Sequence, residues 1–243
     1  MFPLSDDNPR EGPAIVAWTL IAACVVVFLW QLSLGQSGDI AVYGFGMIPA
    51  RLFGEAELSA AIPSVSPPLT IVTSMFMHGG FLHLGGNMLY LWIFGDNVED
   101  SMGHIRFLLF YLVCGAVAAL AQALVEPSST IPMIGASGAV SGVLGAYIVL
   151  HPRATVRTLI ILVVFVTIVH VPAVIVLGIW FLMQFLSAAA MPAGEGGVAF
   201  WAHVGGFLAG MVLVIPFRKR SVALWQPPRS HAFEMERRRG PWG

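Results

Sequence analysis

The sequence predicts an all-α polytopic membrane protein with six transmembrane helices, the fourth of them short. Of its 243 residues, 57% are hydrophobic and only 10% are charged, whereas soluble domains carry roughly 25% charged residues. Six intervals contain no Asp, Glu, Lys or Arg. Each is long enough to hold most or all of a helical membrane crossing, which needs about 20 residues. The alternating segments of about ten residues that are typical of membrane barrels are absent from the sequence.

The helices are expected inside these intervals. The spans, in chain order, are residues 14–34, 69–94, 105–125, 137–150, 172–190 and 199–217. Together they define a membrane domain over residues 14–217. A cytoplasmic segment at 1–13 precedes it, and a basic cytoplasmic tail at 218–243, expected to be disordered, follows it.

The positive charges gather on one side of this arrangement. With the N-terminus inside, Arg51 is the single positive residue on the outer side, while Arg153, Arg157 and 218–220 lie at inner span ends. Because positive residues favour the cytoplasmic side, both termini are expected in the cytoplasm. The first apolar run lacks the features of a signal peptide. The lack of targeting signals and of an added domain favours a prokaryotic plasma membrane.

Three segments are not expected to be ordinary spans. The fourth span would be about 21 Å long as a helix, too short for a hydrocarbon core of about 30 Å. Residues 127–136 must therefore enter the membrane as non-helical backbone, enclosed by protein or lining a wet cavity. The outer loop 35–68 contains large apolar residues and is expected on or in the membrane surface. Residues 158–169 are expected at the cytoplasmic interface, in an extended form.

The composition excludes several classes of function. The net charge is −1 and no basic face is visible, so nucleic acid is not an expected partner. Two cysteines, Cys24 and Cys114, cannot build a disulfide scaffold. No cofactor and no metal are expected, because His78 and His83 are five residues apart without an acid between them.

Polar side chains inside spans are costly, so they are the first candidates for function. The candidates are His78, His83, Asn87, Ser137 and His203. Counting helical rises from the span ends places His83, Ser137 and His203 roughly 6–13 Å below the outer surface. Asn87 follows His83 by one turn, on the same helix face. Three helices thus bring polar groups to one level, which favours a single shared site.

Ser137 has the surroundings of a nucleophile. It begins the short fourth helix between Gly135 and Gly138, and glycines let the backbone turn sharply and a substrate approach closely. The helix N-terminus offers free N–H groups and a positive partial charge, which suit a developing oxyanion.

A serine hydroxyl also needs a base, and His203 lies at similar depth on another span. Every Asp and Glu lies in a loop, in a tail or at a span edge, so no acid completes a triad. The residues therefore indicate a Ser–His dyad. His83 and Asn87 can complete an oxyanion hole as neutral donors.

Three motifs then give the chain a resemblance to a known family. They are Gly135-Ala136-Ser137-Gly138, His83-Leu84-Gly85-Gly86-Asn87 and Ala202-His203-Val204-Gly205-Gly206. Together, and on the right spans, they resemble the rhomboid family of intramembrane serine proteases over about residues 69–217. The resemblance implies a six-helix rhomboid-like bundle, with Ser137 as nucleophile and His203 as general base. It implies that His83, Asn87 and the Ser137 backbone N–H stabilise the oxyanion, and that His78, with Gly135 and Gly138, supports a water-containing cavity.

Two positions depart from the pattern of some members. Those members carry an aromatic residue one turn after the nucleophile, stacked on the catalytic histidine, and here that position is Ser141. Other packing must therefore orient His203. A Trp-Arg pair of the first outer loop is also absent. Small-residue rows that include Gly142, Gly206 and Gly210 are expected to pack the fourth helix against the sixth.

The sequence thus predicts an intramembrane serine endopeptidase whose partners are transmembrane protein substrates and the lipid bilayer. The resemblance implies that a substrate enters laterally, past the second or the fifth helix. The alternative is a non-catalytic rhomboid-like membrane-protein binder or a transporter. The broken entry to the fourth span fits a transporter, but the missing repeat and the missing intramembrane charges do not. The sequence assigns no oligomeric state.

Overall fold

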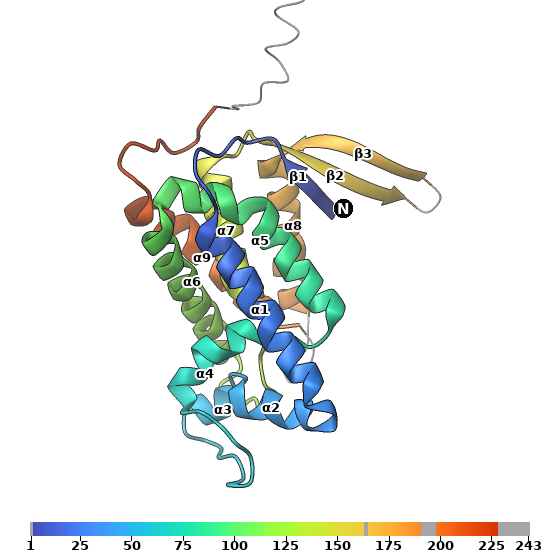
Figure 1. Ribbon diagram of the computed structural model, residues 1–243, viewed down its shortest axis with the longest axis vertical. Helices are drawn as coiled ribbons and strands as arrows, with labels where there is room; N and C mark the ends of the chain where they lie inside the picture. The colour runs from blue at the N-terminus through green and yellow to red at the C-terminus, as the bar shows by residue number, and fades with distance from the viewer. Residues whose placement is uncertain (1, 163–164, 191–197, 228–243) are drawn as a thin grey trace, which may run out of the picture.

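The computed structural model describes residues 2–162, 165–190 and 198–227, and it is mostly helical (Figure 1). Within this part of the chain, four helices are long and apolar enough to cross a membrane. They are α1 (Ile15–Ser33), α6 (His104–Val125), α8 (Ala173–Ala190) and α9 (Phe200–Phe217). Two more helices, α5 (Phe81–Met102) and α7 (Ser137–Leu150), pack among them. The strands lie at one end of the bundle and the short helices α2 to α4 at the other (Figure 1).

The sequence predicts five of the six main helices closely. α1, α6, α8 and α9 begin and end within a residue of their expected spans, and α7 has the expected bounds. This agreement has a physical cause. An apolar segment in lipid must satisfy its own backbone hydrogen bonds, so hydropathy alone marks where a helix runs.

The expected second span, 69–94, is wrong at both ends. The chain forms α4 (Pro67–Thr73) and a 3-10 turn at Ser74–Phe76, and α5 starts only after Gly79-Gly80. The two glycines disfavour an uninterrupted helix. At the other end α5 continues to Met102, although it passes acidic residues.

The C-terminal part of α5 stays helical because its acidic side chains bind groups from the N-terminal part of the chain. The Glu99 carboxylate accepts hydrogen bonds from the backbone N–H groups of Val16 at 2.9 Å and Ala17 at 2.8 Å. It thereby caps the N-terminus of α1, where such groups have no partner inside the helix. Asp96 pairs with Arg10 at 3.6 Å. Hydropathy places the end of the span before these acidic residues, whereas in the structure they lie inside α5.

The protein is mostly helical, as expected, but it is not all-α, because three strands form a small antiparallel sheet. Their order is β1 (Phe2–Asp6), β2 (Thr155–Leu162) and β3 (Phe165–Pro172). β2 and β3 are rich in β-branched residues, which favour strands. Of the stretch 158–169 that was expected to be extended, they include 158–162 and 165–169, while 163–164 lie outside the described residues. The N-terminal segment adds the third strand, and the Tyr147 hydroxyl of α7 donates a hydrogen bond to Asp6.

The segment 127–136 is non-helical, as its sequence predicts, and the outer loop holds it. That loop contains a 3-10 turn at Gly35–Ser37 and two short helices, α2 (Gly38–Phe45) and α3 (Pro49–Leu52). Met47 and Met133 exchange backbone hydrogen bonds of 3.0 and 2.7 Å, and the Gly135 N–H donates to Ser74 O at 2.9 Å. These bonds set the point at which the chain turns into α7.

Glycines bring α7 and α9 into direct backbone contact. A Cβ atom added to Gly206 would overlap the carbonyl oxygen of Gly138, and one added to Gly210 would overlap that of Gly142. Close approach of this kind is what small-residue rows permit in membrane helices. It fixes the N-terminal ends of α7 and α9 beside one another.

The first part of the C-terminal tail packs against the bundle. The N–H of Lys219 donates to Ser101 O at 2.8 Å, and those of Trp225 and Gln226 donate to Val149 O and Leu150 O, both at 2.9 Å. These contacts differ from the disordered tail expected from the sequence. Residues 228–243, which include the rest of that tail, lie outside the described residues.

Candidate active site

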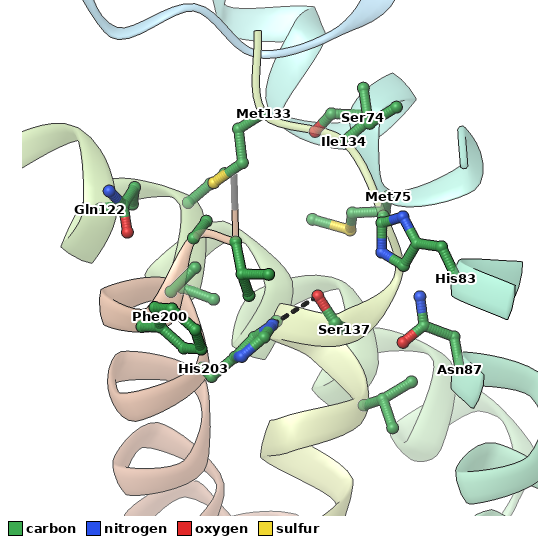
Figure 2. A pocket seen from close by; sticks show the side chains of 18 of the residues that line it. Ser74, Met75, His83, Asn87, Gln122, Met133, Ile134, Ser137, Phe200 and His203 are labelled. Carbon is green, nitrogen blue, oxygen red and sulfur yellow. Dashed lines mark hydrogen bonds between the residues drawn. The ribbon is translucent and has the colours of Figure 1, made fainter. Parts of the chain in front are cut away.

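A cavity of about 1100 Å³ lies at the N-terminal ends of α5, α7 and α9, whereas the strand β2 follows the other end of α7. Its walls come mainly from α5, α6, α7, α8, α9 and the segment 127–136, with further residues from α3, α4 and the 3-10 turn at Ser74–Phe76. The cavity brings together four of the polar residues singled out from the sequence, which are His83, Asn87, Ser137 and His203. Figure 2 shows Ser137 with His203 on one side and with His83 and Asn87 on the other.

Ser137 and His203 are in direct contact. Ser137 Oγ lies 2.7 Å from His203 Nε2, a normal hydrogen-bond length (Figure 2). Ser137 is the first residue of α7 and is half-buried, whereas His203 lies in the first turn of α9 and is 8% exposed. The serine hydroxyl therefore has a proton acceptor in place, which is what a serine nucleophile needs.

Gln184 of α8 also binds His203, and sequence reasoning missed it. Its Oε1 lies 2.7 Å from His203 Nδ1. A signal for it was present, because Gln184 is a polar residue within a transmembrane segment, and such residues are functional candidates by default. Gln184 lies outside the three motifs that indicate the other site residues.

His83 and Asn87 face the backbone just before Ser137. A Cβ atom added to Gly135 would lie 2.6 Å from His83 Nε2 and 3.7 Å from Asn87 Nδ2. Asn87 Nδ2 is buried and makes no hydrogen bond within the described part of the chain. The sequence predicts His83 in the middle of a span. In the structure it lies in the first turn of α5 instead.

At two positions close to Ser137, Gly135 and Gly138, the structure leaves no room for a side chain. Gly135 adopts a φ of +122°, in the region that disfavours side chains, and its position leaves room for the His83 ring. Gly138 faces α6, where an added Cβ would lie 2.6 Å from that of Ala118. The peptide that leads into α7 is therefore accessible from the cavity.

His78 lies behind the site. Its side chain is 1% exposed and packs edge-on against the His83 ring, with centroids 5.2 Å apart. Its backbone N–H donates to Gln31 Oε1 at 3.0 Å, which anchors it to α1. His78 is not among the cavity-lining residues, so the geometry gives it contact with His83 rather than with the cavity space.

Other packing does orient His203 in place of the missing aromatic residue. Ser141 donates its hydroxyl to Ser137 O at 2.6 Å and offers no ring. The Trp180 ring of α8 lies 6.0 Å from the His203 ring at an angle of 38°, and the Phe200 ring lies 6.2 Å away, edge-on. α8 therefore contributes both a ring and an amide to the surroundings of His203.

A second serine–histidine pair lies near the sheet, and it is less suited to catalysis. Ser101 Oγ is 3.5 Å from His151 Nε2, a marginal hydrogen-bond distance. The Ser101 hydroxyl donates instead to Asn97 O at 2.8 Å. Neither residue lines the large cavity. Among the residues that the structure describes, no group of three or more His, Cys, Asp or Glu side chains could hold a metal.

Comparison with known proteins relates the chain to one family. The rhomboid domain matches residues 67–220. "Rhomboid protein 1, mitochondrial" of Saccharomyces cerevisiae is 31% identical over 184 residues, which are 72% of this chain and 49% of the relative. "Rhomboid protease GluP" of Bacillus subtilis is 31% identical over 147 residues, or 59% of this chain and 26% of the relative. "Rhomboid-like protein 11, chloroplastic" of Arabidopsis thaliana is 31% identical over 153 residues, or 59% and 50%. The chain spans half or less of the length of these relatives.

Proposed function

Because the chain belongs to the rhomboid family and is therefore a multi-pass integral membrane protein, we propose that it is a serine endopeptidase that cleaves transmembrane proteins in or near the bilayer. The observation that carries this proposal is the 2.7 Å hydrogen bond between Ser137 Oγ and His203 Nε2, inside a cavity at the N-terminus of α7. The similarity to a relative that is named a rhomboid protease, from Bacillus subtilis, adds support.

The reaction would proceed through an acyl-enzyme. His203 Nε2 accepts the Ser137 proton as Oγ attacks the substrate carbonyl carbon. The carbonyl oxygen becomes an oxyanion, for which His83, Asn87 and the Ser137 N–H serve as donors. His203 then gives its proton to the departing amine as the C–N bond breaks. Finally it takes a proton from water as that water attacks the ester carbonyl. The bond between the acyl carbon and Oγ then breaks, and His203 returns the proton to Ser137 Oγ as the acid leaves.

The membrane arrangement that fits this function has six spanning helices. They would be α1, α5, α6, α7, α8 and α9, with α7 too short to cross alone. Arg153, Arg157 and Arg218 lie at the sheet end of the bundle, so the positive-inside rule assigns that end to the cytoplasm. The cavity would then open outward, and both termini would be cytoplasmic. A transmembrane substrate would reach the site laterally, past α5 or α8, and no cofactor is required.

The test is cleavage of a model transmembrane substrate in liposomes. Wild type should cleave it, whereas Ser137→Ala and His203→Ala should lose activity by roughly a thousandfold or more. Ser101→Ala is the matched control and should retain activity, since Ser101 belongs to the pair outside the cavity.

Activity that survives Ser137→Ala, or that is lost in a folded Ser101→Ala variant, would overturn the proposed dyad. A serine-directed fluorophosphonate provides a substrate-independent readout. A wild type that binds transmembrane segments but does not react with this probe would favour the non-catalytic binder.

A further inference from the structure

Gln184 is an amide within an otherwise apolar helix. Apart from Gln184 and Ser187, the residues of α8 are apolar or glycine. A polar side chain in such a helix is costly unless it finds a partner. The partner of Gln184 is His203, since Oε1 lies 2.7 Å from Nδ1. The amide thus faces the active site and lines the same cavity as Ser137.

The direction of the two hydrogen bonds on His203 follows from the orientation of the Gln184 amide, whose Oε1 faces the ring. A carbonyl oxygen only accepts, so the Nδ1–H of His203 donates to Gln184 Oε1. In that tautomer Nε2 carries the lone pair, and Nε2 is the atom that lies 2.7 Å from Ser137 Oγ. The alternative tautomer would present an N–H to the serine and could not accept its proton.

We propose that Gln184 is a positioning residue that holds His203 in the tautomer and orientation needed to activate Ser137. The proposal rests on the serine endopeptidase function proposed above. Gln184 would take the orienting part that an acid plays in a Ser-His-Asp triad, while remaining neutral. Trp180, one helical turn before it, places its ring 6.0 Å from that of His203. The pair at i and i+4 on α8 thus compensates for the absence of an aromatic residue at Ser141.

The arrangement also links a third helix to the dyad. Ser137 belongs to α7 and His203 to α9, and these helices pack through glycine. Gln184 joins them from α8, so the position of α8 controls the orientation of the base. The titratable side chains that line the same cavity are His83, Tyr90 and Glu126.

The tautomer can be measured on the wild-type protein. With ¹⁵N-labelled histidine in liposomes, NMR should find His203 protonated on Nδ1 and not on Nε2 near neutral pH, with the signal assigned by its loss in His203→Ala. In Gln184→Met the preference should disappear. A wild-type His203 that is protonated on Nε2 would overturn the proposal.

Kinetics provides an independent readout. Gln184→Met keeps the volume but removes the acceptor, so kcat should fall about 10- to 100-fold with KM nearly unchanged. Gln184→Glu restores an acceptor and should recover most of that loss. Its added carboxylate favours the charged imidazolium, so the acid limb of the rate–pH profile should move to higher pH. Met183→Leu, at a 60% exposed position on the same helix, is the control and should match wild type.

The outcomes separate this proposal from the proposed function. A wild type that is not labelled by a fluorophosphonate, or a Ser137→Ala variant labelled as fast as wild type, would refute the endopeptidase itself. Labelling of wild type and Gln184→Met at equal rates would refute only the role of Gln184. Equal loss in Gln184→Met and Gln184→Glu, without any change in the pH profile, would reduce Gln184 to a packing residue.

Discussion

Asn87 has a buried side-chain donor that no hydrogen bond among the described residues uses. Its Nδ2 is buried and without a hydrogen bond in the described part of the chain, although a buried polar group in that state is destabilising. The amide faces the approach to Ser137, together with His83 (Figure 2). A donor kept free at this place can bind charge that exists only during the reaction, which is how oxyanion holes work.

The variant Asn87→Ala should therefore lower kcat about 100- to 1000-fold and change KM little. It should not lower stability through a lost Nδ2 bond, since none is made. Steady-state cleavage and thermal unfolding in the same detergent measure both effects. An unchanged kcat would remove Asn87 from the oxyanion hole.

At the scale of elements, the helix contacts decide where the reacting groups lie. The α7 and α9 backbones meet at glycines, and this contact sets the 2.7 Å separation of Ser137 from His203. At the sheet end, α5 and α1 are joined by the Glu99 carboxylate. Each contact depends on one side chain, or on the absence of one.

Gly210→Ala should destabilise the protein by about 1–3 kcal/mol, because the added methyl group overlaps the Gly142 carbonyl. Fluorophosphonate labelling of Ser137 should slow as α7 and α9 move apart. Gly178→Ala is the matched control: it lies on α8 with open space around it and should be neutral or slightly stabilising. Equal unfolding free energies for the two variants would contradict the proposed packing.

Glu99→Gln tests the contact between α5 and α1. The carboxylate accepts from two α1 N–H groups, and its Oε1 also lies 2.5 Å from His104 Nδ1, whereas a neutral amide keeps only one acceptor oxygen. We expect a loss of about 2–3 kcal/mol in unfolding free energy. Glu55→Gln, at an exposed loop position, should change nothing measurable. Should both variants unfold alike, the cap would contribute no net stability.

At the scale of the whole molecule, the sheet joins the N-terminus to the connection between α7 and α8. Asp6 ends β1 and accepts hydrogen bonds from Tyr147 and from Asn97 Nδ2, the latter at 3.1 Å. Burial raises the pKa of the Asp6 carboxyl from 3.8 to about 7, the Tyr147 hydrogen bond opposes this rise, and the charge of Asp96 adds to it. The charge of Asp7, the next residue, is a smaller cause of the same rise in the pKa.

Stability should therefore depend on pH through Asp6. The folded protein binds this proton more tightly than the unfolded chain, so the Asp6 contribution falls as pH rises from about 4 to about 7. Compared with Asp6→Asn, wild type should lose unfolding free energy between pH 5 and pH 8. Denaturant titrations of both proteins at the two pH values measure this difference. A constant difference would mean that Asp6 titrates alike in both states.

Features that depend on neighbouring residues can be predicted from the sequence. Five helices follow from hydropathy, because lipid requires each segment to satisfy its own backbone. The motifs around Ser137 and His203 indicate both residues as site candidates. In the structure, Ser137 Oγ and His203 Nε2 are 2.7 Å apart. Their catalytic roles stay predictions.

Features that need a partner from a distant part of the chain become visible only in the folded structure. The acidic end of α5 is helical because α1 and Arg10 bind its charges. The strand at the N-terminus exists because β2 pairs with it. Gln184 gains significance only when α8 brings it to His203, 19 positions away in the chain. Hydropathy and motifs depend only on residues that are close in the sequence. The free energy of a polar group in a membrane depends on its hydrogen-bond partner, which folding can bring from a distant part of the chain.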